Sequence, residues 1–402
     1  MSCRDVRRLV LLALLSTIDH PLSAVRAQGG SCTNWNTLMN WAQTSAPVAP
    51  WYSIASSADG TQLAAVINNG GIYTSTNAGV TWTATSAPSQ WWVSVTSSAD
   101  GSKLAAVVGG DTGPGRIYAS TNAGVTWTQT SAPNTNWWSI ASSADGTRLA
   151  AVVSGGGIYT STNAGVTWTQ TGAPNADWRS IASSADGTKL AAVVNNGGIY
   201  TSPSAGVAWT KTSAPSTWPA TWTGIASSAD GTKLAAVSDF IPPYISTDSG
   251  ATWTETSLSY QFWVSIASSA DGTILAAMLQ YDAPYISTNS GVTWTETSGP
   301  PGQSWSSIAC SADGTKLAAA AGLRIWTSQA TIQPGLSVAH SGTNVIVSWP
   351  YPSSGWTLQQ CGEPANPAGW LAYSGTISTN ASVKSITLAA AAGNLFFRLV
   401  GP

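Results

Sequence analysis

Charged side chains are scarce in this sequence. Lys, Arg, Asp and Glu make up 8% of its 402 residues, and the formal net charge is −2. No stretch gathers Lys or Arg as a phosphate-binding surface requires. We therefore expect no nucleic acid among its partners.

Histidine and cysteine are almost absent. The two histidines are His20 and His340, so residues 28–330 contain none, which excludes a Ser-His-Asp triad or a histidine-ligated metal in that stretch. The four cysteines form no CxxC pair. The sequence thus predicts neither a metal site nor a cofactor.

Long apolar runs are also missing. The run 9–15 is too short to span a bilayer, follows Arg4, Arg7 and Arg8, and is followed by small residues before Gln28. This order is typical of a secretory signal peptide. We predict that residues 1–27 are removed and that the mature protein is secreted, to the extracellular space, the cell surface or the periplasm, with no membrane-spanning segment.

What the sequence has in abundance is repetition. The tripeptide Ala-Asp-Gly occurs seven times, with 41 to 45 residues between successive copies, and periods of this length are typical of repeat architectures. In the first copy, residues 51–57, 63–67, 72–75 and 81–85 read as short strands separated by Gly, Asn and Asp turns. Four strands in each of seven repeats predict an all-β fold, a seven-bladed β-propeller.

The seventh repeat stops after its third strand, near residue 328. A segment that matches the fourth strand, 40–47, stands before the first complete repeat. We expect this N-terminal strand to complete the last blade and to remove the open sheet edge. The predicted propeller spans residues 28–332, and the strand-like segments of residues 333–402 predict a small C-terminal β-sandwich.

Three cysteines remain after removal of the signal, Cys32, Cys310 and Cys361, and they allow one disulfide. The sequence does not assign the pair. We hypothesise a Cys32–Cys310 bridge across the closing blade, with Cys361 as the competing partner.

One octapeptide recurs inside the repeats. STNAGVTW occupies 75–82 and 161–168, recurs at 120–127, and becomes STDSGATW at 246–253. It resembles the Asp-box, or BNR repeat (Ser-x-Asp-x-Gly-x-Thr-Trp), of the sialidase-like propeller superfamily, although Asn replaces Asp in four copies and the copy at 202–209 is degenerate. The resemblance covers about residues 33–330. The C-terminal segment is similar to the short β-domains that end many secreted bacterial proteins.

The resemblance implies a fold rather than a function, because the superfamily includes sialidases, other glycoside hydrolases, sortilin-type receptors and photosystem assembly factors. Asn serves the turn without a charge, and Gly supplies a positive φ, so we interpret the octapeptide as a structural corner between the third and fourth strands. The Ala-Asp-Gly turns are interpreted in the same way. Neither motif is a predicted catalytic site.

Function should lie on the opposite face, where the connections vary from repeat to repeat. The Trp that opens each repeat is interpreted as packing between blades, whereas additional aromatic and charged side chains suit a ligand such as a sugar. The predicted ligand-binding residues are Trp91, Arg116, Trp138, Arg179, Trp218, Tyr260, Phe262, Tyr281 and Arg324.

A sialidase would need an arginine triad and a Tyr–Glu nucleophile pair, and neither is placed by this sequence. A hydrolase with two carboxylates stays open, with candidates Asp111, Asp177, Asp239 and Asp282. The preferred hypothesis is a non-catalytic binding propeller that recognises carbohydrate or a cell-surface protein. The alternatives are a glycoside hydrolase and an assembly-factor-like protein scaffold.

Overall fold

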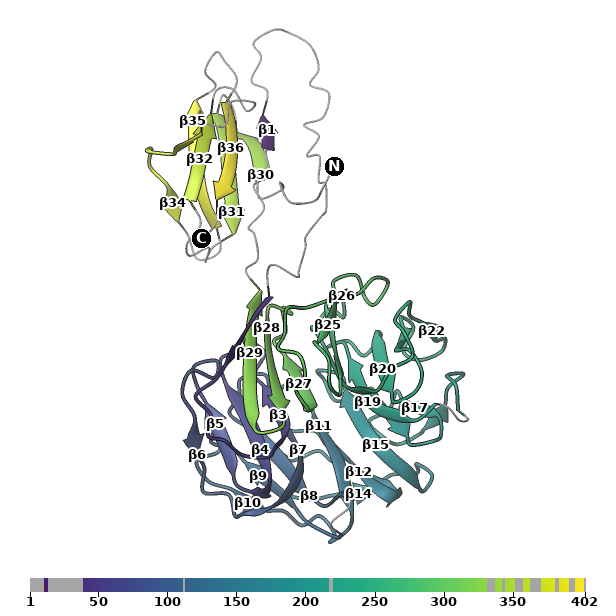
Figure 1. Cartoon of the computed structure of the whole chain (residues 1–402). Coiled ribbons are helices and arrows are strands. Elements are labelled where there is room, and N and C mark those ends of the chain that lie inside the picture. The colour runs from purple at the N-terminus through teal and green to yellow at the C-terminus, as the bar shows by residue number, and fades with distance from the viewer. Residues whose placement is uncertain are drawn as a thin grey trace. The chain divides into compact units, whose positions relative to one another are not determined.

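The computed structural model describes residues 11–13, 39–110, 113–216, 220–330, 337–341, 344–350, 357–361, 370–379, 383–389 and 395–400. The chain divides into two compact units, Asn34–Thr331 and the combination of Met1–Thr33 with Ile332–Pro402 (Figure 1). The assigned elements are all strands. The part of the chain that the structure describes has no helix with the length and hydropathy to cross a membrane.

In the larger unit, the described residues form seven antiparallel sets of four strands, here called repeats one to seven. Their first strands are β3 (Trp51–Ser56), β7 (Gln90–Ser97), β11 (Trp137–Ser142), β15 (Ala176–Ser183), β19 (Trp222–Ser227), β23 (Trp263–Ser268) and β27 (Trp305–Cys310). The second strands are β4 (Leu63–Gly70), β8 (Leu104–Val108), β12 (Leu149–Gly156), β16 (Leu190–Val194), β20 (Leu234–Ser238), β24 (Leu275–Leu279) and β28 (Lys316–Ala321).

The outer strands are shorter. The third strands are β5 (Ile72–Ser75), β9 (Ile117–Ser120), β13 (Ile158–Ser161), β17 (Ile199–Ser202), β21 (Tyr244–Ser246), β25 (Tyr285–Ser287) and β29 (Arg324–Ala330). The fourth strands are β6 (Thr83–Ala84), β10 (Thr128–Gln129), β14 (Thr169–Gln170), β18 (Thr210–Lys211), β22 (Thr254–Glu255), β26 (Thr295–Glu296) and, for repeat seven, β2 (Met39–Gln43).

The repeats form a closed ring. Each first strand packs beside the first strand of the next repeat, and β27 packs beside β3. In Figure 1 the green strands of repeat seven accordingly return to the purple strands of repeat one. The strand β2 pairs antiparallel with β29 from Met39↔Ala330 to Gln43↔Trp326. An N-terminal strand therefore completes the last repeat, as the sequence predicts.

A belt of backbone hydrogen bonds joins the Ala-Asp-Gly turns. The N–H of Ala58 donates to the carbonyl of Ala99, and the same bond recurs from repeat to repeat until Ala312 donates back to Ala58, each with an N···O distance of 2.7 Å. Within each turn the Asp accepts hydrogen bonds, as Asp145 does from Ser143 Oγ and from the backbone N–H of Thr147. The turns thus fasten neighbouring repeats to each other.

The octapeptide is a corner between the third and fourth strands, as expected. In repeat three, Asn163 Oδ1 accepts the N–H of Thr167 at 2.9 Å, and Ser161 Oγ accepts the N–H of Gly165 at 3.0 Å. Gly165 has φ +88°, and Ala164 before it also has a positive φ of 55°. Trp168 closes the corner by donating to the carbonyl of Gly165.

The core lies between the sheets. The second strands are buried on both faces, which is why they read Leu-Ala-Ala followed by apolar residues: small side chains allow adjacent sheets to approach. The seven opening Trp side chains are at most 2% exposed, in agreement with the packing interpretation. Each of six packs edge-on against a third-strand Tyr, as Trp178 does against Tyr200.

The described residues of the smaller unit form two four-stranded sheets. One has the order β1 (Leu11–Ala13), β36 (Leu395–Val400), β32 (Thr357–Cys361), β33 (Leu371–Ala372); the other has β30 (Ser337–Ser341), β31 (Asn344–Pro350), β35 (Val383–Ala389), β34 (Ser378–Thr379). Side chains from both sheets share one core that includes Val347, Trp349, Leu358 and Phe397. β1, which pairs with β36, falls inside the predicted signal peptide.

Candidate functional site

Every repeat has a β-bulge directly after its opening Trp. In repeat four the pairing of β15 with β16 shifts register between Trp178 and Ser180, so Arg179 is the extra residue of the first strand. Bulges redirect a side chain relative to the sheet. The seven bulged residues, here called the variable ring, are Tyr52, Val93, Trp138, Arg179, Thr223, Val264 and Ser306.

The variable ring and the residue after it in each first strand line a single central cavity of about 810 Å³. The second set, here called the serine ring, is Ser53, Ser94, Ser139, Ser180, Gly224, Ser265 and Ser307. Its six hydroxyls each accept a backbone N–H from the next first strand at 3.2–3.3 Å. The serine ring is a nearly constant wall, so the variable ring sets the chemistry of the cavity.

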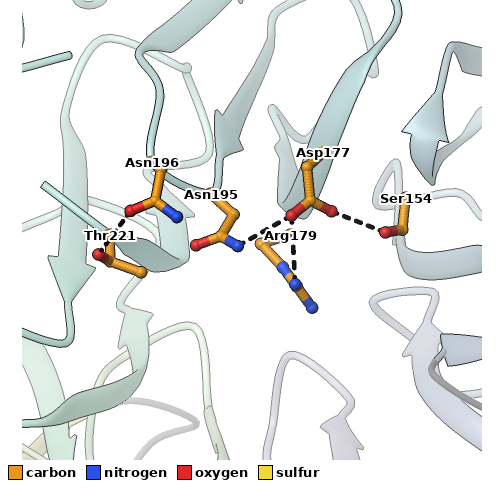
Figure 2. A network of polar contacts seen from close by, with 6 residues as sticks. All are labelled: Ser154, Asp177, Arg179, Asn195, Asn196 and Thr221. Carbon is orange, nitrogen blue, oxygen red and sulfur yellow. Dashed lines mark hydrogen bonds and ion pairs between the residues drawn. The ribbon is translucent and has the colours of Figure 1, made fainter. Parts of the chain in front are cut away.

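Arg179 and Trp138 are the two variable-ring residues that contact each other through a cation–π interaction. The guanidinium carbon of Arg179 lies 4.0 Å from the centroid of the Trp138 ring, a cation–π contact. Its Nη2 is 3.2 Å from Asp177 Oδ2 (Figure 2). These two contacts fix the plane of the guanidinium and partly neutralise its charge.

Asp177 is held by three neighbours, as Figure 2 shows. It accepts hydrogen bonds from Ser154 Oγ at 2.7 Å and from Asn195 Nδ2 at 2.8 Å, in addition to Arg179. Burial by itself raises the pKa of this carboxyl, but the hydrogen bonds and the positive charge outweigh burial and hold the pKa below its ordinary value. Asp177 is therefore an ionised positioning group for Arg179.

Asp239 lies in the same cavity wall, on the connection after β20. Its side chain accepts no hydrogen bond from the described residues, and burial raises its pKa while the charge of Arg179 lowers it less. Its neighbour Phe240 also lines the cavity and is 41% exposed. Phe240 packs edge-on against Phe262, with ring centroids 5.3 Å apart.

The structure brings only part of the predicted site together. Trp138, Arg179 and Asp239 line the cavity, and Asp177 and Phe262 touch residues that do. The other described candidates, outside this lining, are Trp91, Arg116, Tyr260, Tyr281, Asp282 and Arg324.

Those outlying residues have different surroundings. Arg116 donates to the carbonyl of Ala132, and Asp282 accepts the N–H of Ala283. Trp91, Tyr260 and Tyr281 are exposed aromatics. Asp111, Trp218 and Cys32 lie outside the described residues. Cys310 carries a free thiol, so the hypothesised Cys32–Cys310 bridge is not formed in this structure.

Sequence reasoning missed two features. The first is the variable ring as a set. The variation of the residue after each opening Trp, from repeat to repeat, could have indicated it. The structure also holds a Tyr–Glu pair, Tyr244 with Glu255, whose oxygens are 2.6 Å apart. The corresponding outer-strand pair in repeat three is Tyr159–Gln170 at 3.2 Å, so the pair is a cross-strand contact of the scaffold.

No protein-family model and no curated protein matches this chain. Among solved structures, YCF48 from Cyanidioschyzon merolae superposes with a TM-score of 0.56 at 15% identity, over 72% of this chain and 98% of that one. YCF48 bound to a D1 peptide gives 0.56 at 14%, over 73% and 96%. A GH74 xyloglucanase from Xanthomonas campestris gives 0.59 at 14%, over 77% and 59%.

These likenesses show the fold alone at such identities. Together with the ring of antiparallel sheets, they identify the larger unit as a β-propeller. Its central cavity is the candidate site.

Proposed function

We propose that this protein is an exported, non-catalytic binding propeller, with seven Asp-box blades and a small C-terminal β-sandwich, that recognises carbohydrate at its central cavity. The seven four-stranded repeats and the closed belt of turns support the blade number. The corner geometry at Asn163 and Gly165 supports the Asp-box assignment.

One observation carries the choice of ligand. Asp239 is a half-buried carboxyl without a hydrogen-bond donor among the described residues, and it lies in a wall that also contains Trp138, Phe240 and the amide of Asn195. Sugar hydroxyls donate to carboxylates, and the C–H faces of sugar rings pack on aromatic side chains. A neutral polyhydroxylated ligand satisfies Asp239 without a new buried charge.

A glycan array tests this proposal. We expect the wild-type protein to bind a set of glycans, and Asp239→Ala to lose at least about tenfold in affinity for them, because a buried charge-assisted hydrogen bond is removed. Asp282→Ala, an aspartate outside the cavity, is the matched control and should bind as the wild type does. An array without any bound glycan would reject carbohydrate recognition.

Export has its own test. Cleavage before Gln28 predicts that the protein recovered outside the cytoplasm begins at this residue, which intact mass measurement detects. Recovery of a full-length chain inside the cell would contradict the proposal. Since β1 lies within residues 1–27, cleavage also removes the strand that pairs with β36.

A glycoside hydrolase is the second candidate, because Asp239 lines the cavity, Asp177 lies directly behind the lining residues Asn195 and Arg179, and the pKa values of these two carboxyls shift in opposite directions. Burial raises the pKa of Asp239, whereas Ser154, Asn195 and Arg179 lower that of Asp177. Such a difference is the usual basis for dividing acid and base roles. Release of reducing ends from polysaccharide, abolished by Asp239→Asn, would establish the enzyme; the binding proposal expects none.

A protein ligand is the third candidate. Tyr260, Phe262 and Tyr281 are 68%, 52% and 63% exposed, and exposed aromatics are common at protein interfaces. One structural neighbour, YCF48, has been solved with a bound D1 peptide. This function would be favoured if the wild type bound a cell-surface protein but no glycan on the array, and if the double variant Tyr260→Ala/Phe262→Ala no longer bound that protein.

A further inference from the structure

The serine ring is broken at one position. Six repeats have Ser two residues after the opening Trp, whereas repeat five has Gly224. The φ of Gly224 is not in the left-handed region, so the backbone does not require glycine there. The exception therefore changes the cavity wall rather than the strand.

The missing side chain leaves a backbone donor without its usual acceptor. In repeat four, Ser180 Oγ accepts the N–H of Ile225 at 3.3 Å, and the other five hydroxyls accept from the equivalent residue of the next repeat. The equivalent donor next to Gly224 is the N–H of Ile266, and no described side chain accepts it. A Cβ added to Gly224 would lie 3.7 Å from this nitrogen and 3.1 Å from Val237 Cγ2, so the valine side chain borders the position.

The resulting notch, formed by Gly224 and Ile266, opens into the central cavity, because both residues line it. The variable-ring side chains that flank the notch, Thr223 and Val264, are small. The Thr223 hydroxyl donates a hydrogen bond to the carbonyl of Trp263 at 2.7 Å. The large side chains of the ring, such as Trp138, lie in other repeats. Asp239 belongs to repeat five, as Gly224 does.

We infer that this notch is a subsite for one hydroxymethyl group of a hexose unit. The side chain that is absent from the ring is CH₂OH, which has the same composition as the exocyclic group of a hexopyranose. Its oxygen would accept the N–H of Ile266 as the six Ser hydroxyls accept theirs, while ring hydroxyls donate to Asp239. The inference rests on the proposed carbohydrate function and specifies the sugar: hexoses are bound in preference to pentoses, which lack this group.

The first test needs no ligand. Residue-resolved amide hydrogen exchange should find Ile266 the fastest of the seven equivalent amides, and Gly224→Ser should slow it to the range of Ile225 and Ile308. Gly224→Ala fills the notch but offers no acceptor, so Ile266 should remain fast. Equal protection of all seven amides in the wild type would overturn the inference.

The second test uses three probes by calorimetry: cellotetraose, mannotetraose and xylotetraose. We expect at least one of the two hexose oligomers to bind about tenfold or more tightly than xylotetraose, and Gly224→Ser and Gly224→Ala both to abolish this preference. Asp282→Ala, which changes an aspartate outside the cavity lining, should leave the preference unchanged.

The outcomes separate the subsite from the general function. Equal affinities for hexose and pentose oligomers, unaffected by Gly224→Ser, would reject the subsite and keep the carbohydrate function. Failure of all three probes would reject the subsite as stated; an empty glycan array would then reject the function as well.

Discussion

The two ends of the strands in this propeller follow opposite rules. At the turn end, the same hydrogen bonds are repeated seven times and close into a belt. The turn aspartates are alike too: side-chain hydrogen bonds from Ser or Thr lower the pKa of six of them to about 2. At the cavity end, equivalent positions hold Tyr, Val, Trp, Arg, Thr and Ser. The repeated residues thus lie where neighbouring repeats are joined, and the residues that differ between repeats lie at the candidate site.

Two adjacent residues give the largest contrast. Trp178 is fully buried and donates to the carbonyl of Pro174, so Trp178→Ala should lower the free energy of unfolding by about 3–5 kcal/mol. Arg179→Ala removes only partly exposed contacts and should lower it by about 1 kcal/mol or less. Denaturant unfolding measures both, and equal losses would mean that the bulge does not separate core from cavity.

Two glycines sharpen the contrast next. Gly165 has φ +88°, and an added Cβ would lie 3.2 Å from Thr130 Cγ2, so Gly165→Ala should destabilise by about 1–2 kcal/mol. Gly224→Ala has no penalty at φ, but its Cβ would lie 3.1 Å from Val237 Cγ2, so we expect a smaller loss than at Gly165, of about 1 kcal/mol or less. Thermal unfolding of the two variants decides, and a stability loss at Gly224 as large as at Gly165 would make it a structural glycine.

The turn aspartates predict the behaviour in acid. Their folded pKa of about 2 lies below the ordinary 3.8, so their stabilisation is complete above pH 4 and is lost as the pH falls towards 2. Asp145→Ala should lower the free energy of unfolding by about 1 kcal/mol at pH 7. The difference from the wild type should shrink as the pH falls through 2 and disappear below it. A difference that persisted in acid would show that the charge of Asp145 is irrelevant.

The smallest effect has the opposite sign. Because burial raises the pKa of Asp239, its ionisation disfavours the folded state as the pH rises above 3.8. Asp239→Asn should therefore be slightly more stable than the wild type at pH 7, by about 0.5 kcal/mol or less, and equal to it below pH 3.8. A destabilised Asp239→Asn at pH 7 would place Asp239 with the structural aspartates.

The scaffold was readable from the sequence because its rules are local and repeated. The turn at Asp145, the corner at Asn163 and the buried position of Trp178 all follow from residue type and spacing. One local detail could not be predicted. The corner has a positive φ at Ala164 as well as at Gly165, and an alanine in the sequence does not indicate a positive φ.

The site was only partly readable because it depends on the bulges. Strict alternation would direct Arg179 away from the side that Trp178 occupies, but it does not reveal that the side chain enters a central cavity. Arg116 and Arg324 have the same chemistry and lie elsewhere. Residues from different repeats meet only when the ring closes, which a single strand pattern cannot report.

The bulge after each opening Trp has a consequence for how such a protein changes over generations. Each variable-ring residue lies between the packed Trp before it and the serine-ring residue after it, which is a hydrogen-bonded Ser in six repeats. Substitutions there alter the lining of the cavity and keep the belt of turn hydrogen bonds and the hydrogen bonds of the serine ring. Duplication of one stable repeat therefore supplies seven variable positions around one cavity, and substitutions there can change specificity while the belt of turn hydrogen bonds is kept.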